Sequence, residues 1–275
     1  MTHLDTQLQT LKNEINEMFI LVISQMTKAK DALINFDKDL ALDVDINEKR
    51  INVYELKIDR DCENILALYN PVAVDLRFIL AALKINYNLE RIGDYAHGIA
   101  HIVKDMETPF ETELLDKTNI IEMYEETLSI LQESMQAFTD EDNKIAITIF
   151  GKDKKLNDYN KKANKLIEEY ISLNMNKIND SLDILSVIRK LERVGDQTKN
   201  IAEEIIFYID AKVIKHGKKI IRVKEYFYQM YHWNKHLLWL FYKMLQSFIM
   251  FNFHDGVDSY YWIRFHLKYK STKIK

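Results

Sequence analysis

The sequence predicts an all-α protein built from a duplicated three-helix unit, and three observations indicate this fold class. The 275 residues include only two prolines and six glycines, so the usual punctuation of strands and hairpins is scarce. Apolar residues recur at helical spacing over long stretches. Finally, "LERIGDYAHGIA" at 89–100 returns as "LERVGDQTKNIA" at 191–202, which indicates an internal repeat.

Three long helices are expected in the first half of the chain. An apolar seam with steps of mostly three and four residues predicts a helix over 4–36; its members are Leu4, Leu8, Leu11, Ile15, Met18, Val22, Ala29 and Phe36. Asp37 or Asp39 can cap a second helix that runs to about 68. Asn70 can cap a third helix with Pro71 in its first turn, ending near Val103.

The second half repeats this pattern, with helices expected near 111–138, 141–173 and 181–214 and Gly217 after the last one. Seven residues of the third helix recur 102 positions later: Leu83, Leu89, Arg91, Gly93, Asp94, Ile99 and Ala100. We therefore expect one three-helix domain over 1–106, a second over 107–215 and a C-terminal extension over 216–275.

Composition restricts the function and the compartment. A net charge of −4 argues against a nucleic-acid-binding surface over the whole protein. The N-terminus shows no secretory signal, and Cys62 as the sole cysteine excludes an intrachain disulfide. These features predict a cytoplasmic protein. Nucleophile sets, phosphate-binding glycine loops and zinc-finger spacings are absent, so we expect no enzyme and no catalytic residues.

The repeated phrase places charged residues on one side of the third helix. At 100° per residue, Glu90, Asp94, His97 and His101 project within 60° of one another, opposite the apolar positions. Such a face is most simply the solvated side of a helix. Three features argue for more: Gly93 and Gly195 lie mid-helix at a cost of ~1 kcal/mol, carboxylates four residues apart repel each other, and the arrangement occurs twice.

Carboxylates at this spacing can direct oxygen atoms at one metal ion. Glu55 and Asp59 on the second helix have the same spacing and are candidates for a second set of ligands. If His97 and His101 contribute, Fe, Mn or Zn is favoured over Ca or Mg. The alternative is that both histidines are ordinary surface residues.

These segments resemble the PhoU family. The resemblance is carried by "NPVAVDLRFILAALKINYNLERIGDYAHGIA" at 70–100 and "LERVGDQTKNIAEE" at 191–204, and it extends over residues 3–215. It implies two three-helix bundles related by a pseudo-two-fold axis, with multinuclear metal clusters on the bundle surface. Iron is the metal expected first, with Mn, Zn or Mg as alternatives. Carried onto this chain, the family's metal motifs are Glu55 with Asp59, Glu90 with Asp94, and Glu192 with Asp196.

The resemblance also implies a role: negative control of phosphate uptake and of the phosphate-starvation response in the cytoplasm. The partners it implies are the ATPase subunit of the phosphate transporter, a phosphate-sensing histidine kinase and a second copy of the chain in a homodimer. Two other functions stay open. One is a carboxylate-bridged, ferritin-like metal protein, although such sites usually carry Glu-x-x-His motifs that point inward. The other is a helical adaptor without metal.

The second copy of the motif departs from the first. An offset of 102 maps Glu55 and Asp59 onto Asn157 and Lys161, and Lys199 stands where His97 stands in the first copy. We therefore expect weak metal binding, or none, at Glu192 and Asp196.

The extension 216–275 differs from the rest of the chain. It carries 11 of the 38 basic residues but only 3 of the 42 acidic ones, and 16 of the 31 aromatic residues. Its apolar segment 237–253 is interrupted by polar residues and falls below the ~20 residues of a membrane span. Two interpretations stay open: peripheral contact with a membrane surface, or non-homologous sequence such as out-of-frame translation.

Overall fold

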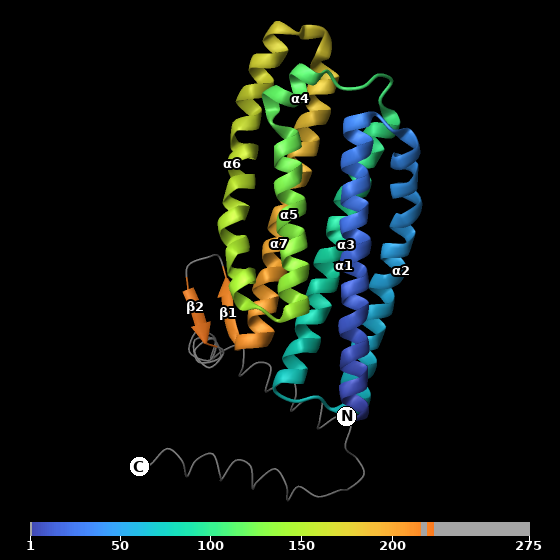
Figure 1. Ribbon diagram of the computed structural model, residues 1–275, viewed down its shortest axis with the longest axis vertical. Coiled ribbons are helices and arrows are strands. Elements are labelled where there is room, and N and C mark those ends of the chain that lie inside the picture. The colour runs from blue at the N-terminus through green and yellow to red at the C-terminus, as the bar shows by residue number, and fades with distance from the viewer. Residues whose placement is uncertain (1, 216–218, 223–275) are drawn as a thin grey trace, which may run out of the picture. The chain divides into compact units, whose positions relative to one another are not determined.

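The computed structural model describes residues 2–215 and 219–222. Within them, two bundles of three long helices lie side by side (Figure 1). The first bundle consists of α1 (His3–Asn35), α2 (Lys38–Tyr69) and α3 (Val74–Asp105). The second consists of α5 (Ile120–Asp140), α6 (Asn143–Leu173) and α7 (Ile178–Asp210). The short helix α4 (Thr112–Thr118) precedes the second bundle, and a 3-10 turn, Met175–Lys177, joins α6 to α7.

Local sequence explains most of the helix ends. Thr2 and Asp5 form a capping box at the start of α1, with the Thr2 Oγ1 accepting from the Asp5 amide at 3.1 Å. Asp37, one of the two candidates that the sequence offered, caps α2, because its carboxylate accepts from two backbone amides of the first turn. Asp142 caps α6 in the same way. Each of these aspartates follows a residue in the left-handed conformation that ends the preceding helix.

Three expected helix boundaries were wrong. Asn70 does not begin α3; it ends α2 in the left-handed conformation with φ 48°, and Ala73 precedes α3. The helix expected over 111–138 is broken at Asn119, with φ 52°, because asparagine adopts this conformation at low cost. The last long helix, α7, ends at Asp210, and Ala211 adopts the left-handed conformation after it. The helix was expected to reach 214 with Gly217 beyond it, and Gly217 lies outside the described residues.

A short antiparallel hairpin follows α7. Strand β1 (Lys212–Lys215) pairs with β2 (Lys219–Arg222), so the part of the expected extension that is described begins as a strand. Residues 1–222 form one compact unit. The expectations for 223–275, membrane contact included, lie outside the described residues, and the division into domains 1–106, 107–215 and 216–275 stays a prediction. None of the described helices combines the length and apolarity needed to cross a membrane.

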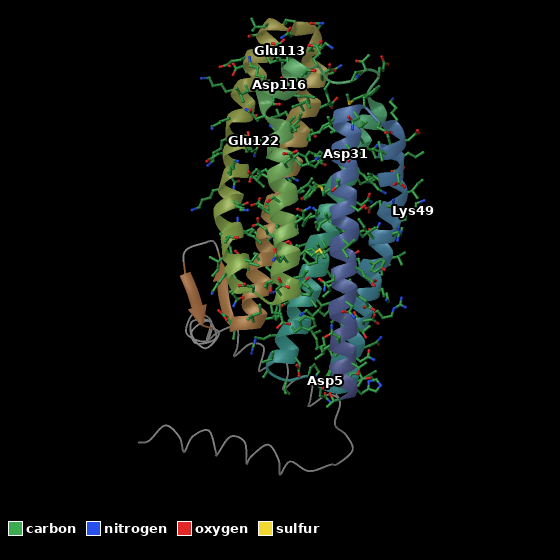
Figure 2. All side chains as sticks on the ribbon, in the orientation of Figure 1. Asp5, Asp31, Lys49, Glu113, Asp116 and Glu122 are labelled. Atoms are coloured by element: carbon green, nitrogen blue, oxygen red, sulfur yellow. The ribbon has the colours of Figure 1, made fainter. Side chains whose placement is uncertain are left out.

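The two bundles share one hydrophobic core. Helix α3 packs against α7, and α1 packs against α5. Where these four helices meet, the ring centroids of Phe19, Phe78, Phe138 and Tyr208 lie 5.5–6.4 Å apart in tilted, stacked and edge-on pairs. Aromatic contacts of this kind stabilise a core by ~0.5–1.5 kcal/mol each beyond their buried area. Figure 2 shows charged side chains such as Asp31, Lys49 and Glu122 on the outside of the helices.

The structure also defines the register of the repeat. Phe36 and Glu141 end α1 and α5 in the same conformation, 105 positions apart, and the buried positions of α2 and α6 match at that same offset. Gly93 and Gly195, in contrast, are 102 positions apart in α3 and α7. The second copy is thus three residues shorter around the turn that joins its last two helices.

The glycines of the repeated motif allow close helix packing. A Cβ atom built on Gly93 would lie 2.8 Å from Ile51 Cδ1 of α2. One built on Gly195 would lie 2.6 Å from Leu156 Cδ1 of α6, and Ile51 and Leu156 are equivalent at the offset of 105. The mid-helix glycines are therefore explained by the close approach of α2 to α3 and of α6 to α7.

We predict that Gly195→Val lowers the free energy of unfolding by about 2–3 kcal/mol, because its side chain overpacks the contact with Leu156 and Asp153. Gly151 of α6 is the matched control, since a Cβ built there meets nothing within 4 Å. Gly151→Ala should stabilise by up to ~1 kcal/mol through helix propensity. Urea denaturation measures both effects; equal tolerance of Gly151→Val and Gly195→Val would contradict the close approach.

Candidate metal centre

Five carboxylates gather where α2 and α3 approach each other, and we call them the carboxylate cluster: Glu48, Glu55, Asp59, Glu90 and Asp94. The structure brings together the two pairs that the sequence singled out. Opposite them on α3, the expected apolar positions are fully buried, namely Ile85, Ile92, Ala96, Ile99 and Val103. The charged face therefore lies toward α2 and solvent, and the apolar face forms the core.

Burial and mutual repulsion raise the pKa of carboxylates in this cluster. Burial, followed by the charges of Asp94 and Glu55, raises the pKa of Glu90 to about 7. Burial, followed by Asp59 and Asp94, also raises the pKa of Glu55. Within the described residues, Arg91 pairs with Asp94 at 3.6 Å, and no salt bridge reaches the other four carboxylates. The cluster thus holds more negative charge than the protein neutralises.

Glu48 is the member of the cluster that sequence reasoning missed. Its pKa is raised, first by burial and then by Asp94. Its Oε2 atom is buried and has no hydrogen-bond partner among the described residues, as is also true of Asn86 Oδ1. Unpartnered buried oxygens are uncommon, and water or an ion can satisfy them. Asp153 Oδ1, on the counterpart of Glu48 in the second bundle, is unpartnered among the described residues as well. The signal was present, since Glu48 precedes Glu55 by seven residues, two helical turns on the same side of α2.

Asn86 of α3 orients the α2 side of the cluster. Its amide nitrogen donates to Asp59 Oδ1 at 2.9 Å and to the carbonyl oxygen of Glu55 at 2.9 Å. This neutral donor holds the Asp59 carboxylate without cancelling its charge.

The two histidines lie against Asp45 of α2, a residue that the sequence analysis did not single out. His97 Nε2 lies 2.7 Å from Asp45 Oδ1 of α2, and His101 Nε2 lies 4.0 Å from the same atom. Lys104 Nζ donates to Asp45 Oδ2 at 3.0 Å. The Lys104 ammonium, together with the hydrogen bond to His97, lowers the pKa of Asp45 to about 2. Sequence reasoning missed Asp45, which has no partner carboxylate four residues away on its own helix.

The second bundle places Glu192 and Asp196 in the same position but with other neighbours. Mapping Glu55 and Asp59 onto Asn157 and Lys161 was wrong, because α2 and α6 correspond at an offset of 105 and not 102. At the offset of 105 the counterparts of Glu55 and Asp59 are Asn160 and Asn164, so the second bundle still lacks that carboxylate pair.

The offset of 102 also placed the wrong lysine, Lys161, near this site. Lys161 is exposed and pairs with Asp158 at 3.5 Å. Lys199, the counterpart of His97, is the residue that enters the site. Its ammonium lies 3.1 Å from Asp153 Oδ2 and 3.4 Å from Asp196 Oδ1. Asp153, whose side chain is only 5% exposed, is the counterpart of Glu48.

Burial, then Asp196 and Asp153, raises the pKa of Glu192. A lysine of the chain itself thus stands among the carboxylates of the second bundle. In the first bundle His97 holds the corresponding position, and the cation that reaches the carboxylates is Arg91, 3.6 Å from Asp94.

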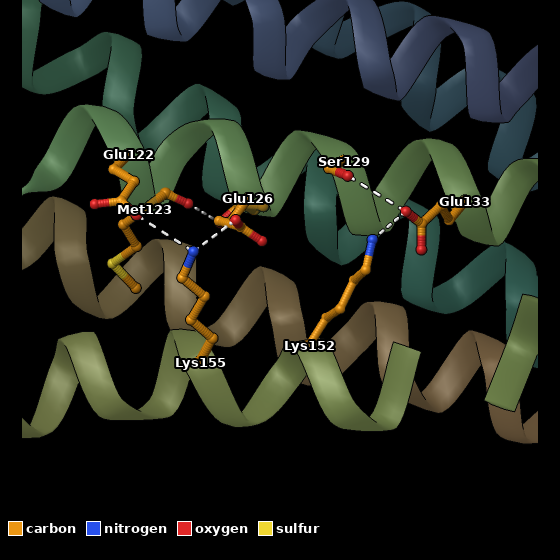
Figure 3. A network of polar contacts seen from close by, with 8 residues as sticks. Glu122, Met123, Glu126, Ser129, Glu133, Lys152 and Lys155 are labelled. Atoms are coloured by element: carbon orange, nitrogen blue, oxygen red, sulfur yellow. Dashed lines mark hydrogen bonds and ion pairs between the residues drawn. The ribbon is translucent and has the colours of Figure 1, made fainter. Parts of the chain in front are cut away.

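Lysines also neutralise acidic residues between α5 and α6. Lys155 Nζ lies between Glu126, at 2.7 Å, and Glu122, at 3.3 Å (Figure 3). One helical turn away, Lys152 pairs with Glu133, which also accepts from Ser129. This network is largely exposed, so each pair contributes at most ~1 kcal/mol to stability.

Comparison with known proteins identifies the fold and its repeat. The model of the PhoU domain matches residues 15–103 and again 120–205. The chain belongs to the PhoU family. The two matches begin 105 residues apart, which is the offset found between the caps of α1 and α5. The fold class and the resemblance read from the sequence are thereby confirmed.

Named relatives agree with this assignment. A "Phosphate-specific transport system accessory protein PhoU homolog" from Burkholderia sp is 31% identical over 213 residues, covering 77% of this chain and 91% of the relative. The accessory protein PhoU of Escherichia coli K12 is 29% identical over 212 residues, covering 77% and 87%. The crystal structure of PhoU from Pseudomonas aeruginosa superposes with a TM-score of 0.69 at 29% identity, covering 75% of this chain and 99% of that one.

The raised pKa of Glu90 gives a pH-dependent stability. Between pH 4.5 and about 7 Glu90 binds more protons in the folded metal-free protein than in the unfolded chain, so its contribution to stability falls as pH rises through this window. We predict that Glu90→Gln flattens this fall and stabilises the protein at pH 7.5 by about 1 kcal/mol, a value discounted for solvent screening.

Urea denaturation in chelator at pH 5 and pH 7.5 measures the effect, with Glu168→Gln as the control on an exposed position. A pH dependence in Glu90→Gln as steep as in the wild type would contradict the electrostatic coupling.

Proposed function

We propose that this chain is an accessory protein of a phosphate-specific transport system. It would restrain phosphate uptake and the phosphate-starvation response by binding other proteins. The observation that carries the proposal is the match of both halves of the chain to the PhoU domain, together with relatives named as accessory proteins of that system. These relatives are not named as enzymes, which agrees with a regulatory role without catalysis.

The proposed partners follow from the family. They are the ATPase subunit of the transporter and a phosphate-sensing histidine kinase, both met in the cytoplasm, with the chain acting as a homodimer. The long paired helices offer extended surfaces of the kind that suit such contacts.

We propose that the carboxylate cluster binds a metal ion. Five carboxylates supply hard oxygen ligands, Glu48 Oε2 is buried without a partner among the described residues, and the cluster holds excess negative charge. Oxygen-rich sites suit Mn, Mg and iron ions, and we propose iron as the principal occupant. A bound cation would offset the carboxylate repulsion and join α2 to α3. Asn86 would hold Asp59 in place as a ligand.

The same comparison argues against metal at Glu192 and Asp196. Lys199 supplies a positive charge to Asp153 and Asp196, and a divalent ion would have to displace this ammonium or bind beside it. Asn160 and Asn164 provide no charge in place of Glu55 and Asp59. We therefore propose that, of these two carboxylate sites, the one in the first bundle is occupied and the one in the second bundle is not.

Metal titration tests this inequality. Asp94→Asn should weaken Mn²⁺ or Fe²⁺ binding at least tenfold, because it removes a central carboxylate from the cluster. The matched variant Asp196→Asn should change the affinity less than twofold. Isothermal titration of the metal-free proteins under anaerobic conditions decides between them; a greater loss in Asp196→Asn would show that the second bundle holds the ion.

Complementation tests the regulatory role. We predict that the full chain restores phosphate-dependent repression of a starvation reporter in bacteria that lack their own PhoU protein. Asp94→Asn should restore it less well if metal contributes, whereas Asp196→Asn should behave as the wild type. A wild-type chain that is expressed and folded but leaves the reporter fully active would contradict the proposed function.

A further inference from the structure

His97, His101 and Asp45 lie beside the carboxylate cluster but offer a different ligand chemistry. One potential ligand atom from each residue lies within 4.8 Å of the other two. Two come from imidazoles one helical turn apart on α3, and the third is a carboxylate oxygen of α2. Two nitrogens and one oxygen form a softer set than five carboxylates, and this set suits Zn²⁺ and similar borderline ions.

We propose that Asp45, His97 and His101 form a second metal site, which binds one Zn²⁺-like ion separately from the ion of the carboxylate cluster. We call it the histidine site. This proposal does not depend on the transport role argued above.

The observed distances are close to what such an ion requires. Ligand atoms around a tetrahedral Zn²⁺ are roughly 3.3 Å apart, given bond lengths of about 2.0–2.2 Å. Here the distances from Asp45 Oδ1 are 2.7 Å to His97 Nε2 and 4.0 Å to His101 Nε2. For both nitrogens to coordinate an ion, His97 Nε2 would move slightly away from Asp45 Oδ1 and His101 Nε2 slightly toward it. Side-chain rotations can supply both movements. The His101 side chain is 51% exposed, which leaves a fourth position open to water.

The surroundings orient the ligands. Lys104 donates to Asp45 Oδ2, so the other oxygen of this carboxylate is left for the histidines and the ion. A hydrogen bond to a metal-binding carboxylate is a common supporting contact. The ammonium also repels a cation, but His97 interacts electrostatically with Glu48 and follows Asp94 by three residues, so negative charge on that side offsets the repulsion.

The second bundle supplies an internal comparison. At the corresponding positions Asp45 is replaced by Phe150, His97 by Lys199 and Lys104 by Ile206. Two of the three ligands and the supporting residue are lost together there, and Glu203 stands in place of His101. The histidine site therefore belongs to the first bundle alone.

Zn²⁺ titration of the full chain tests the site. The metal-free protein is first saturated with Mn²⁺ to fill the carboxylate cluster, and Zn²⁺ is then added in a calorimeter. We expect one further binding step in the wild type, weakened at least tenfold in His101→Gln. Asp45→Asn should weaken it as well. The control His3→Gln changes a histidine that stacks on Tyr69 and should bind as the wild type does.

Two results would overturn the proposal. One is unchanged Zn²⁺ binding in His101→Gln, a substitution at a half-exposed position that leaves the fold intact. The other is a loss of the Zn²⁺ step in Asp94→Asn equal to that in His101→Gln, since the ion would then lie in the carboxylate cluster. Co²⁺ gives a second readout, because the visible absorption of four-coordinate Co²⁺ should appear in the wild type and disappear in His101→Gln.

Discussion

The close contact of two helices at a glycine is the constraint on which the rest of this structure depends. Without a side chain at Gly93, α2 can pack Ile51 directly against α3, and Gly195 does the same for Leu156 of α6. This contact brings carboxylates of neighbouring helices within range of one another. Glu48 Oε2 lies 3.7 Å from the position of a Gly93 Cβ, and Asp153 Oδ1 lies 3.3 Å from that of Gly195. Packing and electrostatics are therefore set at the same point.

Each bundle resolves the resulting repulsion differently. In the second bundle Lys199 places its ammonium between Asp153 and Asp196, so the chain itself offsets part of the negative charge. In the first bundle His97 turns to Asp45, and burial, followed by the charges of Asp94 and Glu55, raises the pKa of Glu90 to about 7. One backbone arrangement thus carries a carboxylate site that includes a lysine and a carboxylate site without one.

Sequence reasoning succeeded where the information is local. The seam of α1, the Asp37 cap and the opposed faces of α3 all follow from spacing along one helix, and the structure confirms them. The repeat indicated the duplication because its motif is long and carries a costly mid-helix glycine.

Sequence reasoning failed where the answer depends on packing between segments. The break at Asn119 could not be distinguished from a continuous helix by periodicity. The three-residue shortening shifted the register between α2 and α6, so Asn160 and Asn164 were overlooked. Glu48 and Asp45 were missed because their partners lie on another helix, at distances that only the folded chain defines.

Anomalous diffraction from crystals grown with Mn²⁺ tests the central claim, that the two bundles differ in their need for a cation. Data collected at the manganese absorption edge locate the ion directly, without relying on a variant. We expect anomalous density among Glu48, Glu55, Asp59, Glu90 and Asp94, and none beside Lys199. Peaks of equal height in both bundles, or a peak only at Glu192 and Asp196, would contradict the account.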